Sequence, residues 1–122
     1  MFGEEMKHED TLITDEGMLT FHFKLHTPRT QSEELPNPPY IFIDWIAAEP
    51  PRRGLLKKYA SKMIARIREK LGSDREIIFQ PANGDTEDDP AQEKLKTYYQ
   101  SCGFDYLPSS SRNFWMTWPR KN

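Results

Sequence analysis

The sequence predicts a mixed α/β fold, an α+β chain built around one mixed sheet in the order ββ-β-α-β-α-ββ. Three observations predict it. Short apolar segments alternate with polar residues or run on continuously, as strands do, and two longer segments repeat apolar residues every three or four positions, as amphipathic helices do. One of these helical segments joins two strand segments in mid-chain, which favours a parallel pair with a right-handed crossover.

The composition restricts the classes of protein to which the chain can belong. Its 122 residues suit a single domain, 1–122, and its net charge of −2 disfavours a general nucleic-acid binder, which is normally strongly basic. The one cysteine, Cys102, excludes an intramolecular disulfide and a cysteine-based zinc site. Since no segment resembles a membrane span or a signal peptide, we expect a cytoplasmic protein.

The N-terminal part predicts a hairpin. Residues 1–9 are polar and are expected to form a flexible end. In TLITDEGMLTFHFKLHT, residues 11–27, the DEG segment at 15–17 supplies a tight turn. The apolar residues after that turn alternate with polar ones, including two histidines that we expect to face water. The proline-rich residues 28–39 are expected to form a loop.

The middle of the chain predicts the central strand and the first helix. Residues 40–48, YIFIDWIAA, are apolar except for Asp44, which is typical of a strand buried on both faces. Two prolines after Glu49 end this strand. Residues 55–71 then place apolar side chains every three or four positions, and Gly72 is a natural stop for the helix.

The remaining elements follow the same rules. Residues 76–80, EIIFQ, predict a short buried strand. The acidic loop 81–89 leads into a helix over 90–102, for which Asp89 is the expected N-cap and a proline occupies the first position. Gly103 ends that helix, and the segments FDYL and NFWMTW predict two closing strands.

Basic residues gather where the first helix begins: Arg52, Arg53, Lys57 and Lys58. A helix N-terminus already carries partial positive charge, so helix stability alone does not explain these cations. A helix that starts after the carboxyl end of a central strand is also where α/β sheets bind anions. The residues therefore allow two interpretations, a cradle for a phosphate-bearing ligand or a solvated basic face.

The element order and two motifs resemble the GNAT superfamily of N-acetyltransferases. YYQSCGF, residues 98–104, resembles the family's tyrosine-containing helix end, Y-x-x-x-G-F, and RRGLLKKYA, residues 52–60, occupies the place of its pyrophosphate loop. The resemblance covers residues 40–118. Only Gly54 is a glycine in that loop, and the N-terminal strand and helices of the usual acceptor-side lid are missing. The chain therefore resembles a compact GNAT member with a degenerate loop.

The resemblance implies an acetyl-CoA-dependent N-acetyltransferase in which a primary amine attacks the thioester directly, without an acyl-enzyme and without a metal. Acetyl-CoA would lie in the splay between strands 40–48 and 76–80, and backbone N–H groups would polarise its carbonyl. Tyr99 would protonate the CoA thiolate, and Asp44 or Glu49 would accept a proton from the amine. The residues expected to bind the cofactor are Ile46, Ala47, Ala48, Arg52, Arg53, Gly54, Leu55, Leu56, Lys57, Lys58 and Asn83. The acceptor would be a small molecule or a protein amine, and a homodimer could supply the missing lid.

Each candidate also has a purely structural interpretation. Tyr99 lies on the apolar stripe of its helix, and Asp44 could pair with a neighbouring strand. The acidic loop 81–89 could attract an amine or a metal, although its irregular spacing favours a solvated loop. Cys102 and the histidines lack the spacing of a Cys–His enzyme. A non-catalytic GNAT-like protein-binding or regulatory module is the alternative function, and the net charge disfavours a third, a basic-helix module that contacts nucleic acid.

Overall fold

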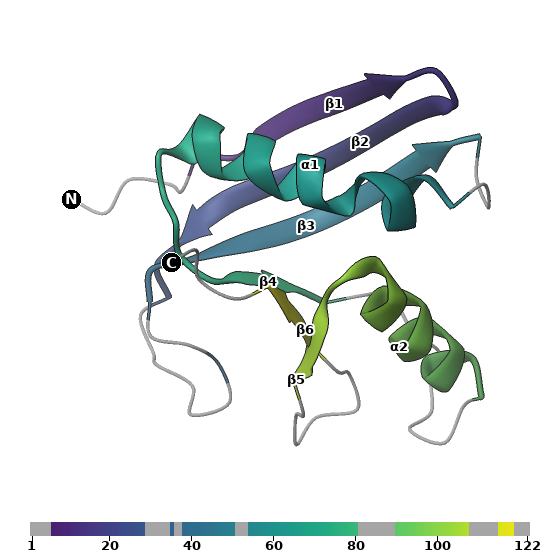
Figure 1. The fold of residues 1–122 in the computed structure, drawn as a ribbon. Coiled ribbons are helices and arrows are strands. Elements are labelled where there is room, and N and C mark those ends of the chain that lie inside the picture. Colours follow the sequence, from purple (N-terminus) through teal and green to yellow (C-terminus); the bar gives the residue numbers. More distant parts are fainter. Residues whose placement is uncertain are drawn as a thin grey trace.

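The computed structural model describes residues 6–28, 35, 38–50, 54–80, 90–107 and 115–118, and these form six strands and two helices. The elements in chain order are β1 His8–Thr14, β2 Gly17–His26, β3 Tyr40–Glu49, α1 Leu55–Leu71, β4 Ile77–Phe79, α2 Pro90–Cys102, β5 Asp105–Leu107 and β6 Trp115–Trp118 (Figure 1). The predicted element order and the mixed α+β class are confirmed.

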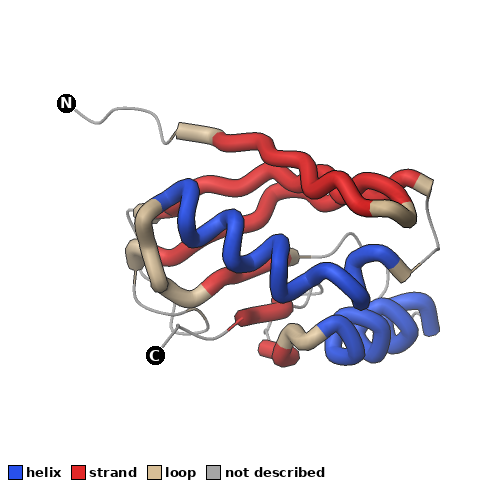
Figure 2. The backbone as a smooth tube through the Cα atoms, turned by 45° about the horizontal axis from the view of Figure 1, so that its top comes forward, coloured by secondary structure: helices blue, strands red, loops and turns tan. Residues whose placement is uncertain are grey.

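The strands form one mixed sheet in the order β1-β2-β3-β4-β6-β5. β3 and β4 run parallel and are connected through α1, whereas the other neighbouring strands are antiparallel. Figure 2 shows α1 lying along one face of the sheet. The parallel pair expected around the first helix is therefore present.

The core lies between α1 and the sheet. The helix presents a buried stripe at helical spacing, and the inward residues of β2 alternate along the strand and face those of β3, so both patterns meet in one apolar layer. This cluster includes Leu19, Phe21, Phe23, Ile41, Ile43, Leu56, Ala60, Met63, Ile64 and Ile67. Gly72 stops the helix as predicted: it adopts φ 63°, and its N–H and that of Ser73 donate to carbonyls of the last turn.

The second helix packs beside the sheet where β4 and β5 lie. α2 ends at Cys102, and Gly103 turns the chain with φ 114°. The N–H of Phe104 donates to the carbonyl oxygen of Tyr99 at 3.1 Å, which directs the buried Phe104 ring into the core. Trp118 of β6 packs edge-on against Phe104 at a ring distance of 5.2 Å. The tyrosine-containing helix end is thus a packed junction between α2 and the closing strands.

Two expectations about the sheet are wrong. His8 and Glu9 belong to β1, where they pair with Phe23 and His22, rather than to a flexible end. β3 is not buried on both faces, because Trp45 is 50% exposed and stacks edge-on with His22 on the face away from α1. Apolar content alone does not reveal whether a second layer covers a strand.

Candidate functional site

The parallel strands β3 and β4 pair over only part of their length. Ile41–Ile43 pair with Ile77–Phe79, and β3 then continues to Glu49 with no partner on that side among the described residues. Backbone groups of a strand point alternately to its two edges, so part of the N–H and C=O groups beyond Ile43 face the opening between β3 and β4. The described residues thus pair β3 with β4 only as far as Ile43, at the place where the resemblance puts the splay.

A β-bulge marks the point where the splay begins. His22 pairs with Trp45 and Phe23 pairs with Ile43, so Asp44 is an extra residue that has no partner on β2. Bulges of this kind re-aim side chains and are frequent beside active sites. Asp44 is exposed, so the premise that it lies in a buried strand is wrong. Nothing in the apolar pattern of 40–48 indicated a bulge.

The residues after the bulge line the same edge. Ile46, Ala47 and Ala48 are partly buried, and their β2 partners are Phe21, Thr20 and Leu19. Ile46 and Ala48 pack against the core, which fixes this part of β3 although one of its edges has no partner among the described residues. Glu49 is exposed at the end of the strand. The backbone expected to hold a thioester carbonyl is therefore rigidly supported from one side.

The N-terminus of α1 follows directly from this edge. Gly54 is the N-cap residue with φ 70°, no described side chain caps the helix, and its first turn contains no acidic residue. The first N–H groups of a helix have no partner within it, so they and the helix dipole favour an anion. Leu55 and Leu56 are buried, and their side chains therefore anchor the turn instead of facing a ligand.

The two lysines of the first turn differ in their partners. The Lys58 ammonium lies 2.6 Å from Oε1 of Glu16 in the β1–β2 turn, and the Tyr59 hydroxyl donates to the other carboxylate oxygen at 3.4 Å. The hydrogen bond with Lys58 lowers the pKa of Glu16, and that with Glu16 raises the pKa of Lys58. Lys58 is thus engaged in joining α1 to the hairpin.

Lys57 is exposed. Burial raises the pKa of Cys102 at the end of α2, hydrogen bonds with Tyr98 and Ser101 act against this rise, and the charge of Lys57 adds a smaller effect in the same direction. Cys102 is 6% exposed, so it is a core thiol that resists ionisation. Lys57 therefore differs from Lys58, whose ammonium is paired with Glu16.

Tyr99 lies at the carboxyl end of β4. Its ring packs edge-on against Phe79, the last residue of β4, at 5.2 Å, and against Phe104 at 6.2 Å. Tyr99 is half-buried, and burial raises the pKa of its phenol, with a further contribution from Cys102. The phenol is consequently neutral at pH 7 and can donate a proton. The structural interpretation of Tyr99, an aromatic ring packed on the apolar stripe of its helix, is confirmed. This packing is compatible with a chemical role for the hydroxyl group.

Tyr98 occupies the neighbouring position with a different environment. It is 38% exposed, and burial raises its pKa to about 12, with hydrogen bonding to Cys102 adding to the shift. Its ring contacts Tyr99 edge-on at 5.3 Å. The two tyrosines therefore form one aromatic pair, but only Tyr99 contacts the end of β4.

Some predicted site residues lie outside the described part of the chain: Arg52, Arg53 and Asn83. The acidic loop 81–89 does so as well. Within the described ranges, no group of three or more His, Cys, Asp or Glu side chains is placed to hold a metal ion. The helices described here are all too short or too polar to cross a membrane.

Among the described residues, the site thus combines a strand edge without a partner, a helix N-terminus with no side-chain cap and a neutral phenol. No family model, curated protein or solved structure matches the chain.

Proposed function

We propose that the chain is a compact GNAT-type N-acetyltransferase that moves an acetyl group from acetyl-CoA to a primary amine. The observation that carries the proposal is the splay of the parallel strands β3 and β4, with the first turn of α1 at one side and Tyr99 at the end of β4. Acetyl-CoA carries a thioester and a pyrophosphate, and these two groups require a backbone edge and an anion site, respectively.

The pyrophosphate would lie at the N-terminus of α1. The N–H groups of Leu55, Leu56 and Lys57 would donate to it, and the exposed Lys57 ammonium would add positive charge. Arg52 and Arg53 precede this turn in the sequence and are expected to take part. Lys58 would contribute little, because Glu16 already engages its charge.

The reaction would proceed in the splay. The neutral amine attacks the thioester carbonyl, whose oxygen is polarised by backbone N–H groups of residues 46–48, and a C–N bond forms. The C–S bond then breaks, and the Tyr99 hydroxyl gives its proton to the CoA thiolate. Asp44 or Glu49, both exposed near the splay, accepts the proton lost by the amine, directly or through water.

A binding and turnover experiment tests the proposal. We expect acetyl-CoA to raise the melting temperature, because a ligand at about 100 times its dissociation constant stabilises the fold by about 2.7 kcal/mol. Calorimetry should give one site, and a panel of polyamines and lysine peptides should release free CoA thiol with at least one member. The absence of any stabilisation at millimolar acetyl-CoA contradicts the proposal.

The degenerate loop favours a second candidate, a GNAT-like module without catalysis. Only Gly54 of the expected loop glycines is present, and Lys58 is engaged by Glu16. Saturable acetyl-CoA binding without thiol release from any amine of the panel would favour this module over the enzyme.

A further inference from the structure

The face of the sheet opposite α1 carries exposed apolar side chains. We call it the open face: it spans β1, β2 and β3, from the row of Glu9, His22 and Trp45 to the row of Ile13, Met18 and Glu49. Ile13, Trp45 and Met18 are 75%, 50% and 40% exposed, and they are three of the five large hydrophobic side chains exposed among the described residues. Exposed apolar side chains that gather on one face mark an interaction surface.

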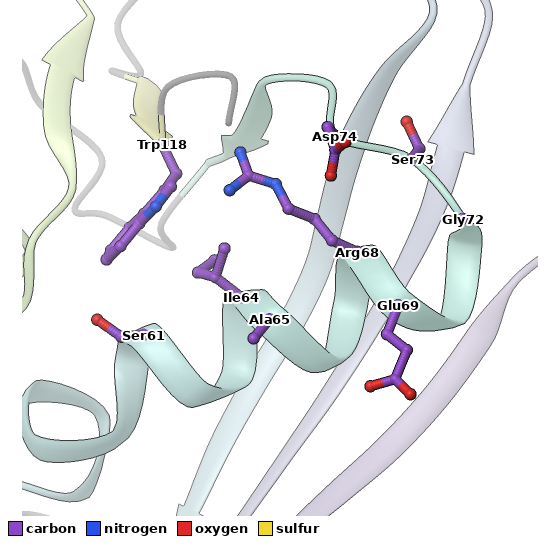
Figure 3. Close-up of a pocket in the computed structure, with 9 residues that line it drawn as sticks. All are labelled: Ser61, Ile64, Ala65, Arg68, Glu69, Gly72, Ser73, Asp74 and Trp118. Carbon is purple, nitrogen blue, oxygen red and sulfur yellow. The ribbon is translucent and has the colours of Figure 1, made fainter. Parts of the chain in front are cut away.

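Trp45 differs in this respect from Trp118. Figure 3 shows Trp118 beside α1, and its ring packs edge-on against Phe104 at 5.2 Å and closely covers Gly103. Packing of the closing strands therefore explains Trp118. Half of Trp45 remains exposed although its ring lies edge-on to His22 at 4.9 Å. Large exposed aromatic side chains of this kind are the usual anchors of protein interfaces.

The middle of the open face is lower than its two sides. Thr11, Thr20 and Ala47 form a row of short side chains across the three strands, and the two threonine hydroxyls lie 3.2 Å apart. Trp45 lies one row to one side of them, and Met18 lies one row to the other. Successive rows on one face of a sheet are about 6.8 Å apart, so these two side chains flank a shallow trough about 13 Å across. The apolar side of one α-helix, which is about 10–12 Å in diameter, matches this spacing.

Carboxylates border the open face. Glu9 and Glu49 are exposed at opposite corners, because Glu9 pairs with His22 of β2 and Glu49 pairs with Met18. Oε1 of Glu9 also lies 3.4 Å from Nε2 of His22. Asp44, which precedes Trp45 in the chain, is exposed as well. The surroundings of the trough therefore favour a positively charged partner.

The lysines nearest to the trough lie at one end of β1 and β2. Lys7 and Lys24 are one row further from the β1–β2 turn than Glu9, and the Lys24 ammonium lies over the Phe42 ring at 5.9 Å. Glu49 lies at the other end, beside that turn. Cations of a partner are therefore attracted most strongly to the half of the open face that contains the trough.

A second copy of the chain complements this surface poorly. A symmetric contact between two open faces would bring the carboxylates of one copy towards those of the other. The exposed side of α1 is basic, but none of the large hydrophobic side chains exposed among the described residues lies on it. It therefore offers nothing apolar to Trp45.

We propose that the open face binds a basic amphipathic helix of another protein. The apolar side of that helix would pack on Trp45, Met18 and Ile13, with Trp45 as the anchor. Its lysines or arginines would pair with Glu9 and Glu49 at the two corners of the trough. This binding requires neither acetyl-CoA nor acetyl transfer.

The test uses the full chain without acetyl-CoA and two synthetic helical peptides. An amphipathic peptide of leucine and lysine should bind at one site with a dissociation constant of about 10–100 μM, typical of a small transient interface. It should also shift the indole N–H resonance of Trp45. The same peptide with glutamate in place of lysine should bind at least about tenfold more weakly at low salt. Equal affinity for the two peptides, or no saturable binding, overturns the proposal.

Variants of apolar residues locate the binding site. Trp45→Ala should weaken binding of the leucine–lysine peptide at least about tenfold, and Met18→Ser, a second exposed position, should weaken it about threefold or more. Tyr98→Ser removes an exposed ring from α2 and is the control, with an expected change below about twofold. Unchanged binding in both Trp45→Ala and Met18→Ser overturns the proposal.

Charge variants and the oligomeric state complete the test. The double variant Glu9→Gln, Glu49→Gln should weaken binding of the leucine–lysine peptide about fivefold at low salt, whereas Glu69→Gln on the exposed side of α1 should change it less than about twofold. Equal effects of the two charge variants contradict the predicted site. Sedimentation of the free chain should show a monomer. A dimer that Trp45→Ala dissociates would show that a second copy occupies the open face, and would overturn the proposal.

Discussion

The Arg66 guanidinium donates two parallel hydrogen bonds to the Asp10 carboxylate, from Nε to Oδ2 at 2.8 Å and from Nη2 to Oδ1 at 2.9 Å. The pair ties the edge strand β1 to the outer side of α1. The Asp10 side chain is 15% exposed and that of Arg66 is 46% exposed. Because the pair has two parallel hydrogen bonds and Asp10 is partly buried, it should stabilise the fold more than an ordinary surface ion pair does.

Asp10→Asn should therefore destabilise the fold modestly, because it removes one charge from a covered pair. Since solvent screens the exposed Arg66, we expect the melting temperature at pH 7 to fall by only about 2–4 °C. Asp105→Asn, which changes an exposed carboxylate of β5, is the matched control and should leave it nearly unchanged. A fall of equal size in both variants would contradict a specific role of the pair.

The same pair predicts a pH dependence. The hydrogen bond from Arg66 is the largest cause that lowers the pKa of Asp10 in the folded state. A lowered folded-state pKa stabilises the fold above the unfolded pKa and ceases to do so as the pH falls through the folded value. The difference in stability between the natural chain and Asp10→Asn should thus be constant near neutral pH and shrink below about pH 4, as urea titrations at several pH values would show.

Both the backbone conformation at position 103 and the Trp118 ring packed against it require a glycine. It has φ 114°, and a Cβ at this position would lie 2.8 Å from the Trp118 ring. Gly103→Ala should therefore lower the free energy of unfolding by about 2–4 kcal/mol, combining backbone strain with a clash in a packed junction. Gly72→Ala is the matched control, because Gly72 has φ 63° but nothing within 4 Å of the added Cβ. Its cost should be only about 1 kcal/mol in urea denaturation, and equal costs would show that the Trp118 contact is unimportant.

The strands and helices were predictable because their patterns are local. Helical spacing over 55–71 and the glycines at positions 72 and 103 determine where the helices begin and end, and the structure agrees. The strand predicted at 76–80 is three residues long, Ile77–Phe79, because its pairing with β3 and β6 extends no further. How far a strand pairs with its neighbours depends on the tertiary structure, and the composition of the strand does not reveal it.

The site was less predictable for the same reason. Tyr99 was found from a helix-end motif, but the bulge at Asp44 depends on the register between β2 and β3, which the sequence of one strand does not reveal. The basic cluster before α1 suggested that its lysines act together. Glu16, which lies far away in the sequence, instead engages Lys58, whereas Lys57 is exposed.

Asp44 should be both replaceable and removable at little cost in stability. Because its side chain is exposed, Asp44→Ala should change the free energy of unfolding by no more than about 0.5 kcal/mol. Deletion of Asp44 removes the bulge but leaves Trp45 opposite His22 and Ile46 opposite Phe21, so Ile46 and Ala48 keep their face of the sheet. The deletion should therefore lower the free energy of unfolding by no more than about 1 kcal/mol in urea denaturation. A loss of more than about 3 kcal/mol would show that the packing of β3 depends on the bulge itself.

Lys57 and Lys58 should differ in their effect on acetyl-CoA. Lys57→Ala should raise the dissociation constant about five- to tenfold, because it removes an exposed cation from the proposed pyrophosphate site. Lys58→Ala should raise it less than about twofold, because Glu16 engages that ammonium. Calorimetry at two salt concentrations measures both effects, and only that of Lys57 should diminish at high salt. A larger effect of Lys58 would relocate the anion site.

Tyr99→Phe should separate catalysis from binding. The variant keeps the ring that packs on Phe79 and Phe104, so melting temperature and acetyl-CoA affinity should change little. Loss of the proton donor should lower the rate of acetyl transfer by about 100-fold or more. Tyr98→Phe, which alters the neighbouring phenol away from β4, is the control and should keep most of the activity. Since burial raises the pKa of Tyr99, the transfer rate of the natural chain should persist to a higher pH than an ordinary phenol would allow. Unchanged turnover in Tyr99→Phe would remove the phenol from the mechanism and leave water as the proton source for the CoA thiolate.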